Sequence, residues 1–248
     1  MTSKDIISAE KPDFFPEDEV PWSPMAGFIL VLVFLGSQAV FGSIPLPFLP
    51  DSYELPFKVG LSNLLVVVAV GSFIDLRAGS FRRGCKSLGL RLPGWRNLLI
   101  RPLTPMLLGI PALLGWALIQ QWALDKLGLT PPRQMVVQIM QDHLSEGLSV
   151  EVGLFITLAV VVAPITEEVL FRGVLYLPMR ERFGTIRAAL AASLLFAAMH
   201  GYAAGFGHLF ILALVLTWLL ENTRTMLWPI LIHALHNGAM IAILILSV

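Results

Sequence analysis

The sequence is short of charged residues and contains a single cysteine. Asp, Glu, Lys and Arg make up 14% of the 248 residues, whereas hydrophobic residues make up 56%. Soluble domains carry about a quarter charged residues, so this composition predicts a membrane protein with several spans. Cys85 has no second cysteine to pair with, which excludes an intrachain disulfide. A formal net charge of zero provides no basic field for nucleic acid, so we expect no nucleic-acid partner.

Neither a secretory leader nor an internal repeat is apparent in the sequence, and we expect neither. Its first residues are polar and acidic, whereas a leader begins with a short basic stretch before its apolar run. We therefore expect residues 1–21 to form an acidic cytoplasmic tail. Many transporters are built from inverted repeats, and the absence of a visible repeat argues against that class.

Long uncharged stretches dominate the rest of the chain and predict its fold class. A membrane-spanning helix needs about 20 apolar residues. The predicted spans are residues 22–44, 57–76, 102–124 and 152–177, two helices within 188–220 separated near Gly201, Gly205 and Gly207, and residues 225–248. The polar loop before the fourth span is expected to hold a short amphipathic helix at 134–144. The prediction is an all-α, polytopic transmembrane helix bundle of about seven to eight helices.

The basic residues predict the orientation of the bundle and its division into parts. All but three of the 17 Lys and Arg residues fall on one predicted side, and Lys58, Lys126 and Arg133 are the exceptions. Cytoplasmic loops are enriched in Lys and Arg, so we expect the N-terminus inside and the C-terminus outside. The expected division is the tail 1–21, the N-terminal helices 22–149 with a basic cytoplasmic loop, and a helix bundle at 150–248 that carries the polar motifs.

Two adjacent glutamates and an arginine interrupt the hydrophobic run at 163–176. An ionisable group at the centre of a span costs at least a few kcal/mol, and such groups usually pair or line a cavity. Glu168 lies four residues before Arg172, an order that favours an ion pair on one helix face. Glu167 is turned about 100° around the helix from Glu168, so we expect it to face another helix and to have a different role.

Two later helices carry polar pairs with one-turn spacing, namely Phe196 with His200 and His233 with Asn237. At about 1.5 Å of rise per residue, Glu167 lies roughly 15 Å from the predicted inner surface, His200 roughly 20 Å and His233 roughly 14 Å. Three helices thus place a carboxylate and two imidazoles near the middle of the bilayer. This shared depth predicts a common polar site.

Such a site fits hydrolysis. A carboxylate and an imidazole, Glu167 and His200, can hold and activate one water molecule. His233 and Asn237 can donate hydrogen bonds to the oxyanion of a tetrahedral intermediate. A metal-dependent alternative uses Glu167, His200 and His233 as zinc ligands, because two His and one Glu match catalytic zinc sites. The HExxH pattern of zincins does not occur in the sequence.

Three motifs occur in order along the chain, each on a different predicted helix: Glu-Glu-x-x-x-Arg at 167–172, Phe-x-x-x-His at 196–200 and His-x-x-x-Asn at 233–237. Together they resemble the family of CAAX proteases and bacteriocin-processing enzymes, which includes the eukaryotic type II CAAX prenyl endopeptidase. The resemblance covers residues 150–247 and implies an intramembrane endopeptidase.

The resemblance also implies a role for each motif residue. Glu167 would activate water with His200, while His233 and Asn237 would form the oxyanion site. The structural support would come from Glu168, Arg172 and Phe196. The family resemblance favours a glutamate mechanism that needs no cofactor, with a divalent metal such as zinc as the alternative.

Packing explanations exist for each of these polar residues. Glu167 could be a second member of the ion pair, and intramembrane His and Asn side chains often serve only as hydrogen bonds between helices. His236 is expected to be structural because it lies on another face than His233. His208 is expected near an interface.

Three function classes follow. The preferred one is an intramembrane endopeptidase of the plasma (inner) membrane that cleaves a membrane-anchored or hydrophobic peptide or protein within the lipid bilayer. The second is a non-catalytic membrane partner, such as a bacteriocin-immunity or protein-sorting accessory. The third is a proton-coupled transporter, which would also use buried Glu and His residues. The oligomeric state and the substrate's identity do not follow from the sequence.

Overall fold

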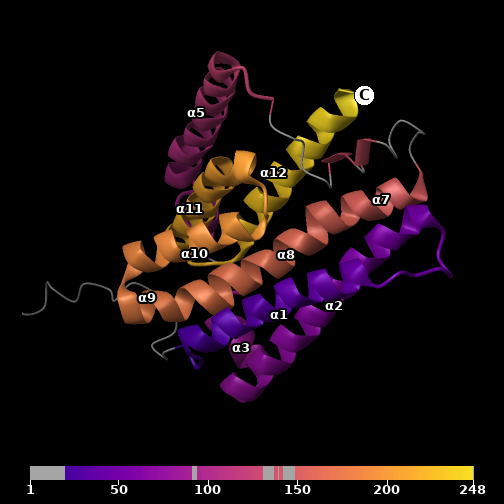
Figure 1. Ribbon diagram of the computed structural model, residues 1–248. Coiled ribbons are helices and arrows are strands. Elements are labelled where there is room, and N and C mark those ends of the chain that lie inside the picture. Colours follow the sequence, from indigo (N-terminus) through magenta and orange to yellow (C-terminus); the bar gives the residue numbers. More distant parts are fainter. Residues whose placement is uncertain (1–19, 91–93, 131–136, 139, 142–148, 248) are drawn as a thin grey trace, which may run out of the picture.

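The computed structural model describes residues 20–90, 94–130, 137–138, 140–141 and 149–247. All regular elements in this part of the chain are helices (Figure 1), which confirms the predicted fold class. Among the described residues, six helical stretches are long and apolar enough to cross a membrane, so this is an integral membrane protein. The predicted tail at 1–21 lies outside the described residues except for 20–21, and of the predicted helix at 134–144 only 137–138 and 140–141 are described, all four as helix.

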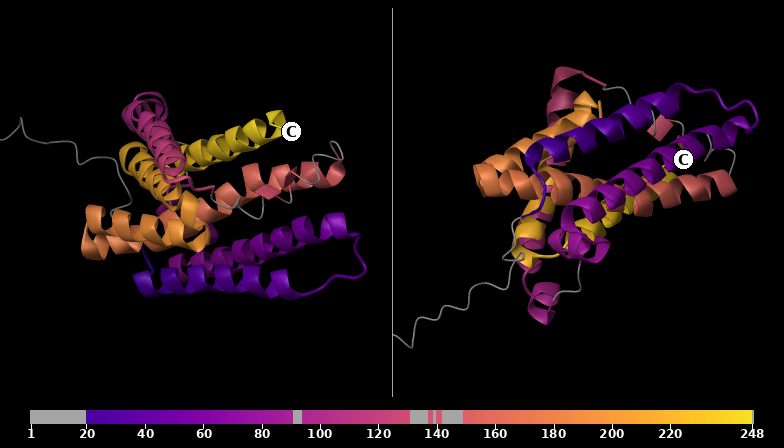
Figure 2. Two further views of the ribbon diagram at one scale, coloured as in Figure 1. Left: turned by 45° about the horizontal axis from the view of Figure 1, so that its top comes forward. Right: turned by 90° about the horizontal axis from the view of Figure 1, so that it is seen from below.

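The first two helices form an antiparallel hairpin. Helix α1, Pro24–Ser43, begins after Ser23, whose side chain accepts a hydrogen bond from the Ala26 amide. Helix α2, Asp51–Ala78, starts earlier than the predicted span, because Glu54 pairs with Lys58 at 2.6 Å and satisfies both charges within the first turns. Figure 2 shows the two helices side by side along their length.

Three further helices follow the hairpin. Helix α3, Phe81–Ser87, folds back onto α2, and α4, Trp95–Leu99, leads into α5, Leu103–Leu127. Pro111 lies inside α5. Helix α5 packs on the later helix α11. It holds the turn after α10 through Gln120, whose amide donates to the Ala204 carbonyl at 2.6 Å.

A continuous helical segment at 150–183 forms the centre of the fold. It consists of α7 (Val150–Thr157), the π-helix η1 (Leu158–Val162), α8 (Ala163–Glu168), the π-helix η2 (Val169–Tyr176) and α9 (Leu177–Phe183). The α1–α2 hairpin covers one side of this segment, and α10, α11 and α12 cover the other (Figures 1 and 2). The central segment therefore has neighbours on both sides, which explains why η2 is the most completely buried part of it.

The last three helices surround the inner part of the central segment. Helix α10, Thr185–Met199, is followed by the short 3-10 turn η3, Ala203–Gly205, and by α11, Phe206–Thr223. This confirms the predicted break near Gly201 and Gly205. Helix α10 has only 15 residues, fewer than a span needs. Helix α12, Leu227–Leu246, ends the described chain.

Close helix packing holds the hairpin against the centre. Gly27 of α1 lies directly on the backbone of η2, so that an added Cβ would approach the Leu175 Cα to 2.9 Å. Small residues allow such backbone approach between membrane helices. The main core cluster joins side chains of α1, α2, η2, α10 and α11, and it positions the polar motif of α8 and η2 relative to α10 and α12.

Candidate active site

Glu167 and Glu168 end helix α8, between two π-helical stretches. A π-helix closes its hydrogen bonds over one more residue than an α-helix and is frequent at functional sites. The η1 and η2 stretches flank α8 directly. The two glutamates therefore lie on a short α-helical stretch, and the residues before and after it have a different angular spacing around the helix axis than in a continuous α-helix. The Glu168 side chain is fully buried, whereas 16% of the Glu167 side chain is exposed.

Glu168 and Arg172 form the ion pair that their spacing predicts. The Arg172 Nη1 lies 2.9 Å from the Glu168 Oε1, and both side chains are buried. Arg172 also donates from Nη2 to the Ala213 carbonyl of α11 at 3.1 Å, and its guanidinium lies 4.8 Å from the centre of the Phe196 ring. The arginine thus ties the central segment to α10 and α11, which supports a structural role.

His233 contacts Glu168 as well, and this contact was not predicted. Its Nδ1 lies 2.8 Å from the Glu168 Oε1, the same oxygen that accepts from Arg172. An ionised carboxylate only accepts hydrogen bonds, so Nδ1 carries the proton and Nε2 is the second, variable nitrogen. The sequence assigned Glu168 to Arg172 alone because helix spacing reveals neighbours on one helix and not partners on another.

Glu167 faces the other nitrogen of the same ring. The Glu167 Oε2 lies 3.8 Å from the His233 Nε2, too far for a direct hydrogen bond and close enough for both groups to contact one water molecule. Glu167 thus faces another helix, as its angular position predicted, but both glutamates face His233, and Glu168 alone also pairs with Arg172. Glu167 is the more accessible carboxylate of the two.

His200 follows the last residue of α10 and packs on Phe196. Its Nδ1 lies 2.8 Å from the Phe196 carbonyl oxygen, which accepts only, so Nδ1 donates and Nε2 keeps a lone pair in the neutral ring. The Phe196 ring lies 4.7 Å from the His200 ring and 5.8 Å from the His233 ring, between centroids. Among the described residues, no direct hydrogen bond joins His200 to Glu167.

Phe196 therefore has a larger role than its sequence context suggests. It is fully buried and contacts both imidazoles and the Arg172 guanidinium. It also meets Phe171 edge to face, with 5.1 Å between ring centroids. A phenyl ring has no polar atom to compete with these groups, so it separates them while holding their positions.

Asn237 binds the backbone of the central segment. Its Nδ2 donates to the Ala159 carbonyl of η1 at 2.9 Å. This contact uses one of the two hydrogens of the Asn237 amide group. The second hydrogen would be the donor to an oxyanion. The joint presentation of His233 and Asn237 to one oxygen remains a prediction. The Ala159 contact joins α12 to the central segment one turn beyond His233.

The metal-dependent alternative finds little support in the geometry. Within the described part of the chain, no three or more His, Cys, Asp or Glu side chains are grouped so as to hold a metal ion. Glu167, His200 and His233 are therefore not arranged as a three-ligand set. A metal-dependent mechanism stays an alternative prediction.

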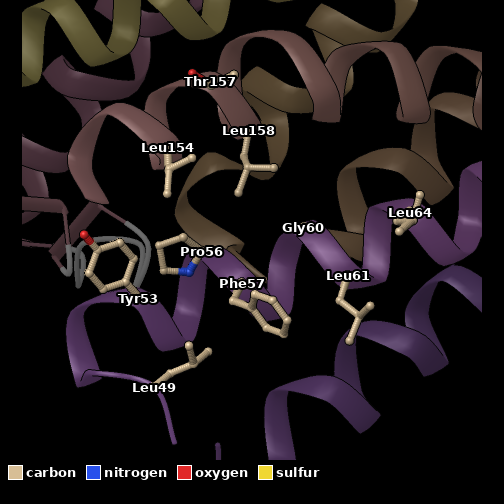
Figure 3. Close-up of a pocket in the computed structure, with 10 residues that line it drawn as sticks. All are labelled: Leu49, Tyr53, Pro56, Phe57, Gly60, Leu61, Leu64, Leu154, Thr157 and Leu158. Carbon is tan, nitrogen blue, oxygen red and sulfur yellow. The ribbon is translucent and has the colours of Figure 1, made fainter. Parts of the chain in front are cut away.

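An apolar cavity lies between α2 and the start of the central segment (Figure 3). Its volume is about 390 Å³, and side chains from Leu49 to Leu64 face Leu154, Thr157 and Leu158 across it. Leu158 precedes Glu167 by nine residues, which is roughly 13 Å along a helix. Apart from the Tyr53 hydroxyl, the lining has no titratable group. The cavity suits the apolar part of a ligand and no chemistry.

A second imidazole pair lies beside the site. The Nε2 atoms of His208 on α11 and His236 on α12 are 3.4 Å apart. The sequence assigned these residues separately to an interface and to a structural position. The i+3 spacing of His236 from His233 was the available signal, but nothing in the sequence reveals that α11 brings His208 to it.

Comparison with known proteins identifies part of the chain. Residues 149–239 match a protein family described as type II CAAX prenyl endopeptidase Rce1-like. No curated protein and no solved structure matches the chain. The matched region contains all three motifs, and it is an Rce1-like domain. Membership of this family implies a membrane protease with a protein substrate in the membrane.

Proposed function

From the Rce1-like type II CAAX prenyl endopeptidase domain at residues 149–239, we propose that the protein is an intramembrane endopeptidase in which Glu167 and His200 activate water. The observation that carries this proposal is the accessible carboxylate of Glu167, held 3.8 Å from an imidazole in the interior of a membrane bundle. Ionisable groups at that depth persist when they serve a site. The N-terminus faces the cytoplasm in this proposal.

The hydrogen bonds of the imidazoles support the assignment of roles. A water molecule between Glu167 and His200 donates one hydrogen to the carboxylate and the other to the His200 Nε2 lone pair. The Phe196 carbonyl favours the required tautomer because it accepts from Nδ1. Glu167 then takes a proton from the water as the oxygen attacks the peptide carbonyl, and returns a proton to the leaving amine.

His233 and Asn237 provide the donors for the oxyanion in this proposal. His233 is oriented by Glu168, which accepts from its Nδ1, so in the doubly protonated ring the Nε2–H points to the side of Glu167. Asn237 offers its second amide hydrogen one turn further along α12. Preorganised donors of this kind contribute about 3–4 kcal/mol each to the stabilisation of a transition state.

The substrate would be a membrane-anchored or hydrophobic peptide or protein. The apolar cavity between α2 and the central segment (Figure 3) can hold an apolar part of such a substrate while the peptide bond extends toward Glu167. The apolar cavity and the buried polar site both lie along the central segment. This arrangement fits a protease that receives its substrate from the membrane.

The test is a cleavage assay with purified protein in lipid vesicles and a membrane-tethered peptide. We expect Glu167→Gln to lower the cleavage rate by about 100-fold or more, the loss typical of a missing general base, with an unchanged unfolding midpoint. The matched control is Glu181→Gln, on the exposed part of the same helical segment, which should cleave normally. A chelator should leave the wild-type rate unchanged. Normal cleavage by Glu167→Gln would refute the proposal.

One observation favours the non-catalytic alternative. Arg172 and His233 both bind Glu168, and Asn237 binds the Ala159 carbonyl, so several motif side chains already serve helix packing. A packing protein would show no cleavage in the wild type, and Glu167→Gln would then keep full cellular function. The same variant therefore separates the two functions.

A further inference from the structure

We propose that Gln120 of α5 is a positioning residue of the protease, because it fixes the turn that follows α10 and thereby the place of His200. The catalytic part of this inference rests on the proposed function, whereas the fixing of the turn does not. Helix α5, Leu103–Leu127, lies outside the matched residues 149–239. A helix that carries none of the three motifs would thus contribute to the proposed site.

His200 lies where the regular helix ends. It is the C-cap of α10, and residues 201–205 after it form a turn in which Gly201 has a φ of 59°. On the helix side, the ring of His200 is held by the Phe196 carbonyl oxygen, 2.8 Å from Nδ1. On the other side, the α-helical hydrogen bonds stop. The backbone position of His200 therefore also depends on what holds the turn.

Gln120 holds this turn from a neighbouring helix. Its Nε2 donates to the Ala204 carbonyl at 2.6 Å, and Ala204 follows His200 by four residues. Within the part of the chain that the structure describes, this is the only side-chain hydrogen bond from another helix to the backbone of the turn. A backbone carbonyl without a donor is costly inside a membrane, so the bond fixes the turn against α5.

Trp116 determines how the Gln120 amide is oriented. The Trp116 Nε1 lies 3.0 Å from the Gln120 Oε1, and an indole N–H can only donate. The oxygen of the amide therefore faces Trp116, and the nitrogen faces the Ala204 carbonyl. The Trp116 ring packs so closely on the first turn of α11 that a Cβ added to Gly207 would collide with it. Helix α5 packs along α11 (Figure 1), which keeps both side chains in place.

A displaced His200 should slow the reaction and leave substrate binding nearly unchanged. In the proposed mechanism, the Nε2 of His200 contacts the attacking water and no other reacting group. A misplacement of about 1 Å in a catalytic group can lower a rate by about 100-fold. We expect Gln120→Ala to lower kcat by about 10- to 100-fold and to keep KM within about twofold.

Hydrogen exchange of the full chain in lipid vesicles tests the fixing of the turn without any need for activity. In Gln120→Ala, the amides at 201–206 should exchange about 2- to 10-fold faster, the effect of one lost hydrogen bond. The matched control is Gln121→Ala, which removes the next side chain of α5, whose amide binds Asp125 on the same helix. It should keep the wild-type exchange and the wild-type cleavage rate. Unchanged exchange in Gln120→Ala would overturn the proposal whether or not the protein cleaves a peptide.

Gln120→Glu separates positioning from a general loss of stability. An ionised Glu can accept from Trp116 but cannot donate to Ala204, whereas a protonated Glu can do both. Partial burial raises the pKa of a carboxyl group, so protonation should restore the bond at mildly acidic pH. The cleavage rate of this variant, divided by the wild-type rate at the same pH, should therefore rise as the pH falls.

The outcomes distinguish this inference from the proposed function. A rate ratio for Gln120→Glu that does not change with pH, or a wild-type kcat in Gln120→Ala, would overturn the positioning role. If the wild type cleaves no peptide, the proposed function fails, and faster exchange in Gln120→Ala would still support the fixing of the turn by α5.

Discussion

Removal of the Arg172 side chain tests how the buried charges stabilise the fold. In Arg172→Met, the fully buried Glu168 loses a partner at 2.9 Å, and the Ala213 carbonyl keeps only the Thr217 hydroxyl as a side-chain donor. At an effective dielectric constant of about 20, the attraction across that distance is about 6 kcal/mol. His233 still contacts Glu168 and offsets part of this loss. We expect a cost of about 3–5 kcal/mol, the range for breaking a buried pair.

The assay is equilibrium unfolding of the detergent-solubilised protein in increasing SDS, with the double variant Glu168→Met and Arg172→Met included. The double variant removes both charges and leaves only the His233 Nδ1 without its acceptor. Its free energy of unfolding should therefore fall by about 1–3 kcal/mol, less than that of Arg172→Met alone. The control Arg187→Met removes an exposed arginine of α10 and should change stability by less than about 0.5 kcal/mol. A double variant at least as unstable as the single one would refute this reasoning.

Two other outcomes are expected. The side chain of Gly27→Val would meet the η2 backbone and should lower the free energy of unfolding by about 1–3 kcal/mol or more. Gly36→Val on the same helix, where an added Cβ meets nothing, should leave the stability unchanged. Equal unfolding midpoints for the two variants would contradict the close packing of α1. Cys85 lies outside the spans, and its partial burial raises the pKa of its thiol, so it holds less thiolate than a free thiol at any pH below that pKa. Its alkylation at pH 8 should therefore be slower than that of a free thiol and should speed up at higher pH, and a rate equal to that of free cysteine would show that the thiol is solvated.

The helices and the ion pair were predictable because they depend on local sequence. Uncharged stretches predicted seven spans, of which six are long and the seventh is the shorter helix α10, and they predicted the break after α10. The i, i+4 spacing predicted the contact of Glu168 with Arg172. Exact bounds were less predictable, since α2 gains its first turns from the Glu54–Lys58 pair, which a hydropathy pattern treats as an interruption.

The site contacts between helices were only partly predictable. Glu167 and His233 were predicted to lie at a similar depth in the membrane, because the rise per residue is the same in every span, and the two side chains do lie close together. Depth says nothing about rotation around the helix axis or lateral neighbours. For that reason the sequence did not reveal that His233 binds Glu168, that Asn237 binds a π-helix carbonyl, or that His208 meets His236.

The shortness of α10 has a consequence for the supply of water. Its 15 residues rise about 22 Å, less than the hydrocarbon thickness of about 30 Å, so the chain leaves regular helix while still at lipid depth. Irregular backbone is stable there only if protein or an aqueous inlet meets its polar groups. Gln120 meets one such carbonyl. Water that meets the other polar groups of this turn would lie next to His200, the residue that caps α10.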